Sequence, residues 1–253
     1  LQALEQSGTD VTAGYVGGFD AGGRVPITTT YLEAGLCPVN VHWHLGTEHR
    51  SAGEYDETGA GPANSYVPDA TGADDSRRLR AQPASEWAVQ QRESHNDQGR
   101  RMGATARLGL RCKKYDANDA KFTTEYNWKH CVDMHVGETY EVHWPHSAAG
   151  ACGTPYQYQT PFYDGVFCMG GIISLDPLNT YQKIGVQGQI FVIVNDESYY
   201  YPDLMRGAIV DAAGSFWQDV AKYTGSTTGT SRSNTVCSKY TPITWQVDRK
   251  VPH

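Results

Sequence analysis

The 253-residue sequence has no Cys-x-x-Cys pair, no Lys/Arg-rich run and no long apolar segment. Without closely spaced cysteine pairs we expect no zinc cluster of the cysteine type. A formal net charge of −7 argues against nucleic acid as a partner. Because no apolar run approaches the roughly 18 residues that a spanning helix needs, we expect no membrane span.

Common catalytic motifs are also missing. There is no Gly-x-Ser-x-Gly elbow, no cysteine in a recognisable nucleophile motif, no phosphate-binding loop and no dinucleotide-binding fingerprint. The sequence therefore argues against enzymes that depend on those motifs.

Cysteine is present but widely spaced. The even number, six, suits up to three disulfides in an oxidising compartment, and six buried thiols in a cytosolic enzyme is the alternative. The chain opens at Leu1 without the charged and apolar regions of a signal peptide, as a trimmed mature form would. We therefore expect a secreted, periplasmic or other luminal location. The cysteines are Cys37, Cys112, Cys131, Cys152, Cys168 and Cys237.

Length and composition predict how the chain is organised. We expect a chain of this length to form a single domain, residues 1–253. From about 50 to 120, Gly, Asp, Arg and Gln dominate while large aliphatic residues are scarce, which predicts a polar insertion on the surface.

Strand signals outnumber helix signals, so we expect a mainly β (α+β) fold. The run over 189–195 is continuously apolar and rich in β-branched residues, which predicts a buried central strand. Apolar residues at three- and four-residue spacing predict a helix over 205–223. A short helix over 85–93 has Ser85 as its cap. The other expected strands are 38–45, 132–144 and 243–247.

The most informative feature is the tripeptide His42-Trp43-His44. Successive side chains of a strand alternate between faces, so these two imidazoles share one face and supply half of a tetrahedral metal site. Nine histidines make a chance His-x-His expected, so the tripeptide alone is a weak signal. Glu48 and His49 follow within five residues and strengthen it.

A second histidine cluster lies about a hundred residues later, in Glu141-Val-His-Trp-Pro-His146. Glu141 and His143 share a strand face, and a carboxylate there suits the role of orienting a ligand imidazole. Pro145 lacks an N–H and is expected to end or bulge the strand, which points His146 away from His143. We therefore expect His143 as the third ligand and rank His146 second.

Both histidine segments resemble a known family. Cys37-Pro-Val-Asn-Val-His-Trp-His-Leu-Gly-Thr-Glu-His49 and Gly137-Glu-Thr-Tyr-Glu-Val-His-Trp-Pro-His-Ser147 resemble the two signature segments of the δ-class carbonic anhydrases of marine algae. The resemblance extends from about residue 30 to the C-terminus. It implies a zinc enzyme that interconverts CO2 and bicarbonate, with three histidine ligands.

A weaker resemblance reaches the α-class carbonic anhydrases, which implies a large, mostly antiparallel twisted sheet with a few surface helices. In that class a threonine precedes a Val-Thr-Trp-x-Val strand by about nine residues, and Thr235 stands at a similar distance before Ile243-Thr-Trp-Gln-Val247. The resemblance implies that Thr235 and Glu48 orient the attacking hydroxide. Here the second threonine after Thr235 is missing and the gap between His44 and Glu48 is shorter.

The implied reaction follows from these residues. Zinc held by His42, His44 and His143, with cobalt or cadmium as substitutes, lowers the pKa of its water to about 7, the general value for carbonic anhydrases. The hydroxide attacks CO2, and a histidine of ordinary pKa then carries the proton away. His49 and His146 are the candidates, and the sequence does not choose between them.

Two other interpretations stay open. His42, His44, Glu48 and His143 also fit a cupin, a jelly-roll protein that binds iron or manganese for dioxygenase or isomerase chemistry, although the second cupin motif is incomplete. Alternatively, the chain is a secreted, non-catalytic binding module whose aromatic run Tyr199–Pro202 stacks on a ligand. The oligomeric state is not predicted.

Overall fold

The computed structural model describes residues 9–62, 109–131, 134–150, 179–200, 219–226 and 242–251, and all structural statements concern these ranges. Within them, no helix is long and apolar enough to cross a membrane. The strands are β1 (Thr9–Asp10), β2 (Cys37–Pro38), β3 (His42–Leu45), β4 (His49–Arg50), β5 (Tyr55–Asp56), β6 (Arg111–Cys112), β7 (Thr139–Ser147), β8 (Ile184–Val192), β9 (Val220–Ser226) and β10 (Pro242–Asp248). The helices are α3 (Ala120–Thr123), α5 (Thr180–Lys183) and the 3-10 turn η3 (Glu197–Tyr199).

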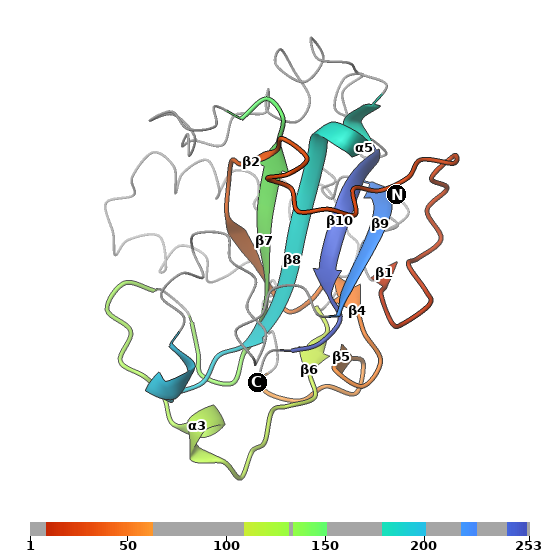
Figure 1. Cartoon of the computed structure of the whole chain (residues 1–253). Helices are drawn as coiled ribbons and strands as arrows, with labels where there is room; N and C mark the ends of the chain where they lie inside the picture. The colour runs from red at the N-terminus through yellow and green to blue at the C-terminus, as the bar shows by residue number, and fades with distance from the viewer. Residues whose placement is uncertain are drawn as a thin grey trace, which may run out of the picture.

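The architecture is a large sheet with the order β2-β7-β8-β10-β9, in which β3 also pairs with β7 (Figure 1). Every pairing in this sheet is antiparallel except that of β8 with β10. Two small sheets, β1-β4 and β5-β6, accompany it. The prediction of a mainly β fold with a mostly antiparallel sheet is confirmed.

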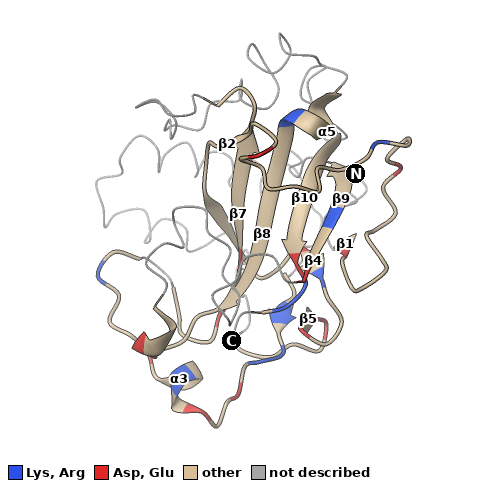
Figure 2. Ribbon diagram, viewed as in Figure 1, with Lys and Arg blue, Asp and Glu red and all other residues tan. Residues whose placement is uncertain are grey.

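The central strands β7 and β8 are almost free of charge, as the tan ribbon in Figure 2 shows. All nine residues of β7 are buried, and Glu141 is the one charged residue in either strand. Burying an ionised carboxylate is costly unless it is paired and hydrogen-bonded. The position of Glu141 therefore calls for specific partners.

Pro145 was expected to end or bulge β7, and the first part of that expectation is wrong. The strand continues to Ser147, and Pro145 lies opposite Val186 of β8. On the other side of β7 the register does contain an extra residue, because the three residues 39–41 face only Trp144 and Pro145. The Pro145 carbonyl accepts from the N–H of Val39, and the N–H and C=O of one strand residue point to the same side. The missing N–H therefore faces the irregular stretch 39–41 between β2 and β3, and the β8 ladder stays intact.

Four other expectations are corrected. The strand expected at 132–144 begins only at Thr139 and continues to Ser147, as β7. The strand expected at 38–45 is divided into β2 and β3, and the central strand expected at 189–195 begins earlier, at Ile184. The helix expected over 205–223 is wrong at its C-terminal end, because Val220–Ser226 forms β9. Residues 205–218 and the helix expected at 85–93 lie outside the described residues. The strand expected at 243–247 is confirmed as β10.

The polar insertion contributes to the core at both of its ends. Tyr55 and Cys112 are fully buried and belong to the main apolar cluster, which includes Trp245. They are brought together by the pairing of β5 with β6. The expectation of a surface segment over all of 50–120 is therefore wrong for these ends, and residues 63–108 lie outside the described ranges.

Within the described ranges, two cysteines are free thiols. Cys112 is buried and Cys131 is exposed. Cys37 is disulfide-bonded, and the other three cysteines lie outside the described residues. With two thiols free, the maximum falls from the expected three disulfides to two.

The close packing of Tyr31 on β8 gives a prediction about stability. A Cβ at Gly185 would lie 2.3 Å from the Tyr31 ring, whose hydroxyl lies within hydrogen-bond distance of Val186 O and Thr244 O. We expect Gly185→Ala to lower the free energy of unfolding by about 1–3 kcal/mol. Urea unfolding measures this. Gly188→Ala is the control, because its Cβ meets nothing closer than 3.4 Å; an equal loss there would contradict the explanation.

Candidate metal centre

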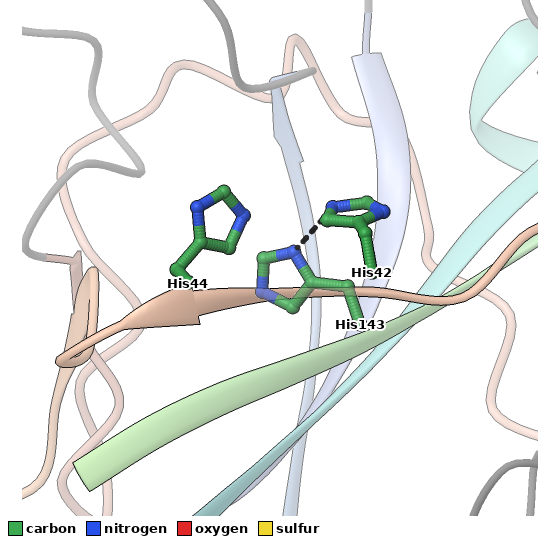
Figure 3. Close-up of side chains that lie close together, drawn as sticks. All are labelled: His42, His44 and His143. Atoms are coloured by element: carbon green, nitrogen blue, oxygen red, sulfur yellow. Dashed lines mark hydrogen bonds between the residues drawn. The ribbon is translucent and has the colours of Figure 1, made fainter. Parts of the chain in front are cut away.

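The pairing of β3 with β7 brings the two histidine segments face to face. His42 lies directly opposite His143, and His44 lies opposite Glu141. Directly opposite residues of paired strands project to the same face. The three imidazoles therefore converge on one side of the sheet, as Figure 3 shows.

The three imidazoles lie close enough to share one ion. His42, His44 and His143 each offer a nitrogen, and these nitrogens all lie within 4.8 Å of one another. His143 Nδ1 is 3.2 Å from His42 Nε2. Two nitrogens bound to a tetrahedral zinc at 2.0–2.1 Å are about 3.3 Å apart, so this pair already has nearly the spacing that zinc requires.

Burial differs within the cluster. The side chain of His143 is 1 % exposed, whereas that of His44 is 34 % exposed and His42 is half-buried. The cluster therefore has a closed side at β7 and a more open side at β3. An open side is where a metal site admits water and substrate.

Glu141 orients His143 from behind. Its Oε1 lies 2.8 Å from His143 Nε2 and also accepts a hydrogen bond from His49 Nδ1. Its Oε2 accepts the backbone N–H groups of Glu48 and His49, at 2.7 and 3.3 Å. Burial by itself would raise the pKa of Glu141, but the His49 and His143 rings hold it well below its ordinary value. The carboxylate is therefore ionised and accepts only.

A tight turn brings Glu48 and His49 to Glu141. Gly46 has φ of 72°, a left-handed conformation that glycine adopts without strain, and its N–H donates to Thr139 O. The turn places Glu48 Oε1 3.4 Å from His143 Nε2 and 3.9 Å from His44 Nε2. Glu48 thus lies at the cluster, as expected.

His49 lies in the core and not on a path to solvent. It is 0 % exposed, and its Nε2 lies 2.8 Å from the Tyr223 hydroxyl. Burial by itself would lower the pKa of His49, but the Glu141 carboxylate raises it overall. With both ring nitrogens engaged, His49 is not placed to carry a proton outward.

His146 lies on the opposite face of β7 from His143. Its Nδ1 donates to the Trp144 carbonyl at 2.8 Å, and its ring packs on Tyr31 with the centroids 5.0 Å apart. Burial lowers the pKa of His146 to about 4. The structure therefore separates His146 from the three-imidazole cluster, which agrees with our ranking of His143 as third ligand.

The sequence reasoning missed two residues of this region, Tyr223 and Trp245. The Trp245 ring lies 5.0 Å from that of His49 and 5.1 Å from that of His143, centroid to centroid. Residues 220–226, Val-Ala-Lys-Tyr-Thr-Gly-Ser, do not alternate regularly between apolar and polar, so no clear strand signal in the sequence would have found Tyr223. Thr235, expected beside Glu48, lies outside the described residues.

The donor set suits zinc better than a harder metal. The group that contains His42 and His44 consists of three imidazoles, and neutral imidazole is a ligand that zinc, copper, iron and nickel share. The cupin interpretation needs Glu48 as a fourth ligand beside His42, His44 and His143, but Glu48 groups with His49, Glu141 and His143 and not with His42 and His44. The residues present therefore fit zinc held by three histidines.

Fold and site together define a class: a mainly β protein whose central sheet carries a three-histidine cluster able to hold a metal ion. A family model described as Delta carbonic anhydrase matches residues 33–253. The match spans most of the chain, so the chain belongs to the delta carbonic anhydrase family and is a carbonic anhydrase. None of the curated proteins or solved structures compared with the chain matches it.

Proposed function

We propose that this carbonic anhydrase uses one zinc ion per chain, held by His42, His44 and His143, to hydrate CO2 reversibly to bicarbonate and a proton. The observation that carries the proposal is the convergence of these three imidazoles from β3 and β7, with ligand nitrogens within 4.8 Å. A zinc ion held by these residues would bring the pKa of a bound water to about 7, as is general for carbonic anhydrases.

The chain's own residues prepare the site for that chemistry. Because Glu141 accepts at His143 Nε2, the lone pair of His143 is on Nδ1, the nitrogen that faces His42. Glu48 lies next to both His44 and His143. We propose that Glu48 accepts a hydrogen bond from Thr235, which would direct the attacking oxygen toward CO2.

Neither expected carrier of the released proton, His49 or His146, is exposed in the described part of the structure. His49 is fully buried and His146 lies on the other face of the sheet. Efficient carriers have a pKa near the working pH and reach solvent. We therefore propose that neither of these two histidines carries the proton.

Metal analysis combined with a CO2 hydration assay tests the proposal. Purified protein is loaded with zinc, freed of excess metal and assayed by stopped flow. We expect one zinc per chain, loss of hydration on chelation, and recovery with zinc or cobalt. Tightly bound iron without CO2 hydration would favour the cupin alternative. A metal-free protein that hydrates CO2 as fast as the loaded one would contradict the proposal.

An exposed histidine serves as the control for adventitious binding. His130 is exposed and lies outside the cluster, so His130→Ala should keep full zinc and full rate. His42→Ala should lose both, because it leaves two imidazoles. A binding module would instead retain its ligand in His42→Ala.

A further inference from the structure

A chain of buried hydrogen bonds leads from the far edge of the sheet to the candidate ligand His143. The Tyr223 hydroxyl of β9 contacts His49 Nε2 at 2.8 Å, and His49 Nδ1 contacts Glu141 Oε1. Glu141 Oε1 in turn lies 2.8 Å from His143 Nε2. Three of these four side chains are 0 or 1 % exposed, and Tyr223 is 4 % exposed.

The contacts of Glu141 assign the donors around it. Its Oε2 accepts two backbone N–H groups and its Oε1 faces two ring nitrogens, so the carboxylate accepts at each contact, and His49 donates from Nδ1 and His143 from Nε2. At its other nitrogen, Nε2, the His49 ring lies 2.8 Å from the Tyr223 hydroxyl. Burial raises the pKa of Tyr223 well above its ordinary value, so this hydroxyl keeps its proton. Tyr223 and Glu141 together therefore hold the His49 ring at both of its nitrogens.

Packing prevents the rings from turning to other arrangements. Trp245 contacts both His49 and His143, and its own Nε1–H is anchored to Ser226 O at 3.0 Å. The Glu141 carboxylate is held at its other oxygen by the N–H groups of Glu48 and His49. A change at Tyr223 or His49 must therefore be transmitted to Glu141.

We propose that His49 and Tyr223 are positioning residues for the metal site: they act through Glu141 to hold His143 with Nδ1 facing His42 and His44. This inference rests on the proposed zinc site and assigns these two residues a role distinct from proton transfer. His49 and Tyr223 come from β4 and β9, neither of which carries a candidate ligand.

The test measures zinc affinity by competition with a chelator, a readout that does not depend on catalysis. Loss of a partner of a metal ligand typically costs about 10–100-fold in metal affinity. We expect Tyr223→Phe to weaken zinc binding by about 10-fold, and His49→Leu by about 10–100-fold. His49→Asn should recover part of the loss, because its amide N–H can replace Nδ1–H as the donor to Glu141.

Tyr55→Phe is the matched control. Tyr55 is a second fully buried tyrosine of the same core, and its hydroxyl donates to Asp248 O at 2.7 Å without contacting Glu141. The Tyr55→Phe variant should lose about as much unfolding free energy as Tyr223→Phe, and it should keep the zinc affinity of the wild type. The visible spectrum of cobalt-loaded protein should change for Tyr223→Phe and stay unchanged for Tyr55→Phe.

The outcomes separate this inference from the proposed function. A wild type that binds zinc and hydrates CO2, with Tyr223→Phe and His49→Leu of unchanged zinc affinity, overturns the inference alone. Equal weakening in Tyr55→Phe also overturns it, because any lost buried hydroxyl would then have the same effect. A wild type that binds no zinc overturns the proposed function and the inference with it. If His49→Leu does not fold, Tyr223→Phe decides.

Discussion

His143→Ala should abolish zinc binding and CO2 hydration. The substitution removes the one candidate ligand supplied by β7 and leaves His42 and His44, both on β3, to hold the ion. Two imidazoles from a single strand do not make the three-ligand site that zinc enzymes use. Mutation of a residue that hydrogen-bonds to a metal ligand lowers metal affinity by up to roughly 100-fold. We expect loss of the ligand itself to lower zinc affinity by more than that. Metal analysis and stopped-flow hydration measure the two losses.

His146→Ala is the control that makes this result specific. It removes the same kind of side chain from the same strand, and its burial is similar, 7 % exposed against 1 % for His143. Both variants should lose stability, because each leaves a cavity in a buried strand. Only His143→Ala should lose zinc. If His146→Ala loses zinc and rate while His143→Ala keeps both, the assigned third ligand is wrong.

The part of the site predicted correctly from the sequence is the part that depends on strand alternation. That His42 shares a face with His44, and Glu141 with His143, follows from the two-residue period of a strand. That the two strands are neighbours in register does not follow, because pairing is decided by contacts distant in sequence. The three imidazoles form one cluster because β3 and β7 pair with His42 directly opposite His143.

Errors in the prediction arose where tertiary pairing overrode a local pattern. Residues near 220 continued an apolar spacing typical of a helix, yet Val220–Ser226 pairs along its whole length with β10. In that strand Ala221 and Tyr223 are buried and Lys222 is exposed. Tyr223 was therefore placed on a surface helix, and its contact with His49 could not be foreseen.

Burial was the other property that the sequence could not supply. Histidine is common both at surfaces and in cores, so proximity in sequence made His49 a reasonable proton carrier. Its actual surroundings are Glu141, Tyr223 and Trp245, which come from three other strands. Only the assembled sheet shows that His49 faces inward.

Glu141→Gln should cost both metal affinity and stability. The amide can accept at one position only and carries no charge, so it cannot receive two imidazole N–H groups and two backbone N–H groups as Glu141 does. Breaking a buried charge network of this kind costs about 3–5 kcal/mol of unfolding free energy. We expect zinc affinity to fall by about 10–100-fold in parallel. Chemical unfolding of the zinc-free protein and chelator competition measure these effects separately.

The pH dependence of the stability lost in Glu141→Gln tests whether the carboxylate charge is the cause of that loss. The pKa of Glu141 is held well below 4.5, so the folded state favours the ionised carboxylate more strongly than the unfolded chain does. Its stabilisation is therefore fully present above about pH 4.5 and is lost as the pH falls through the folded pKa. The difference in unfolding free energy between wild type and Glu141→Gln should be constant near neutrality and shrink in acid. A difference that persists unchanged in acid would show that shape, and not the carboxylate charge, holds His143 in place.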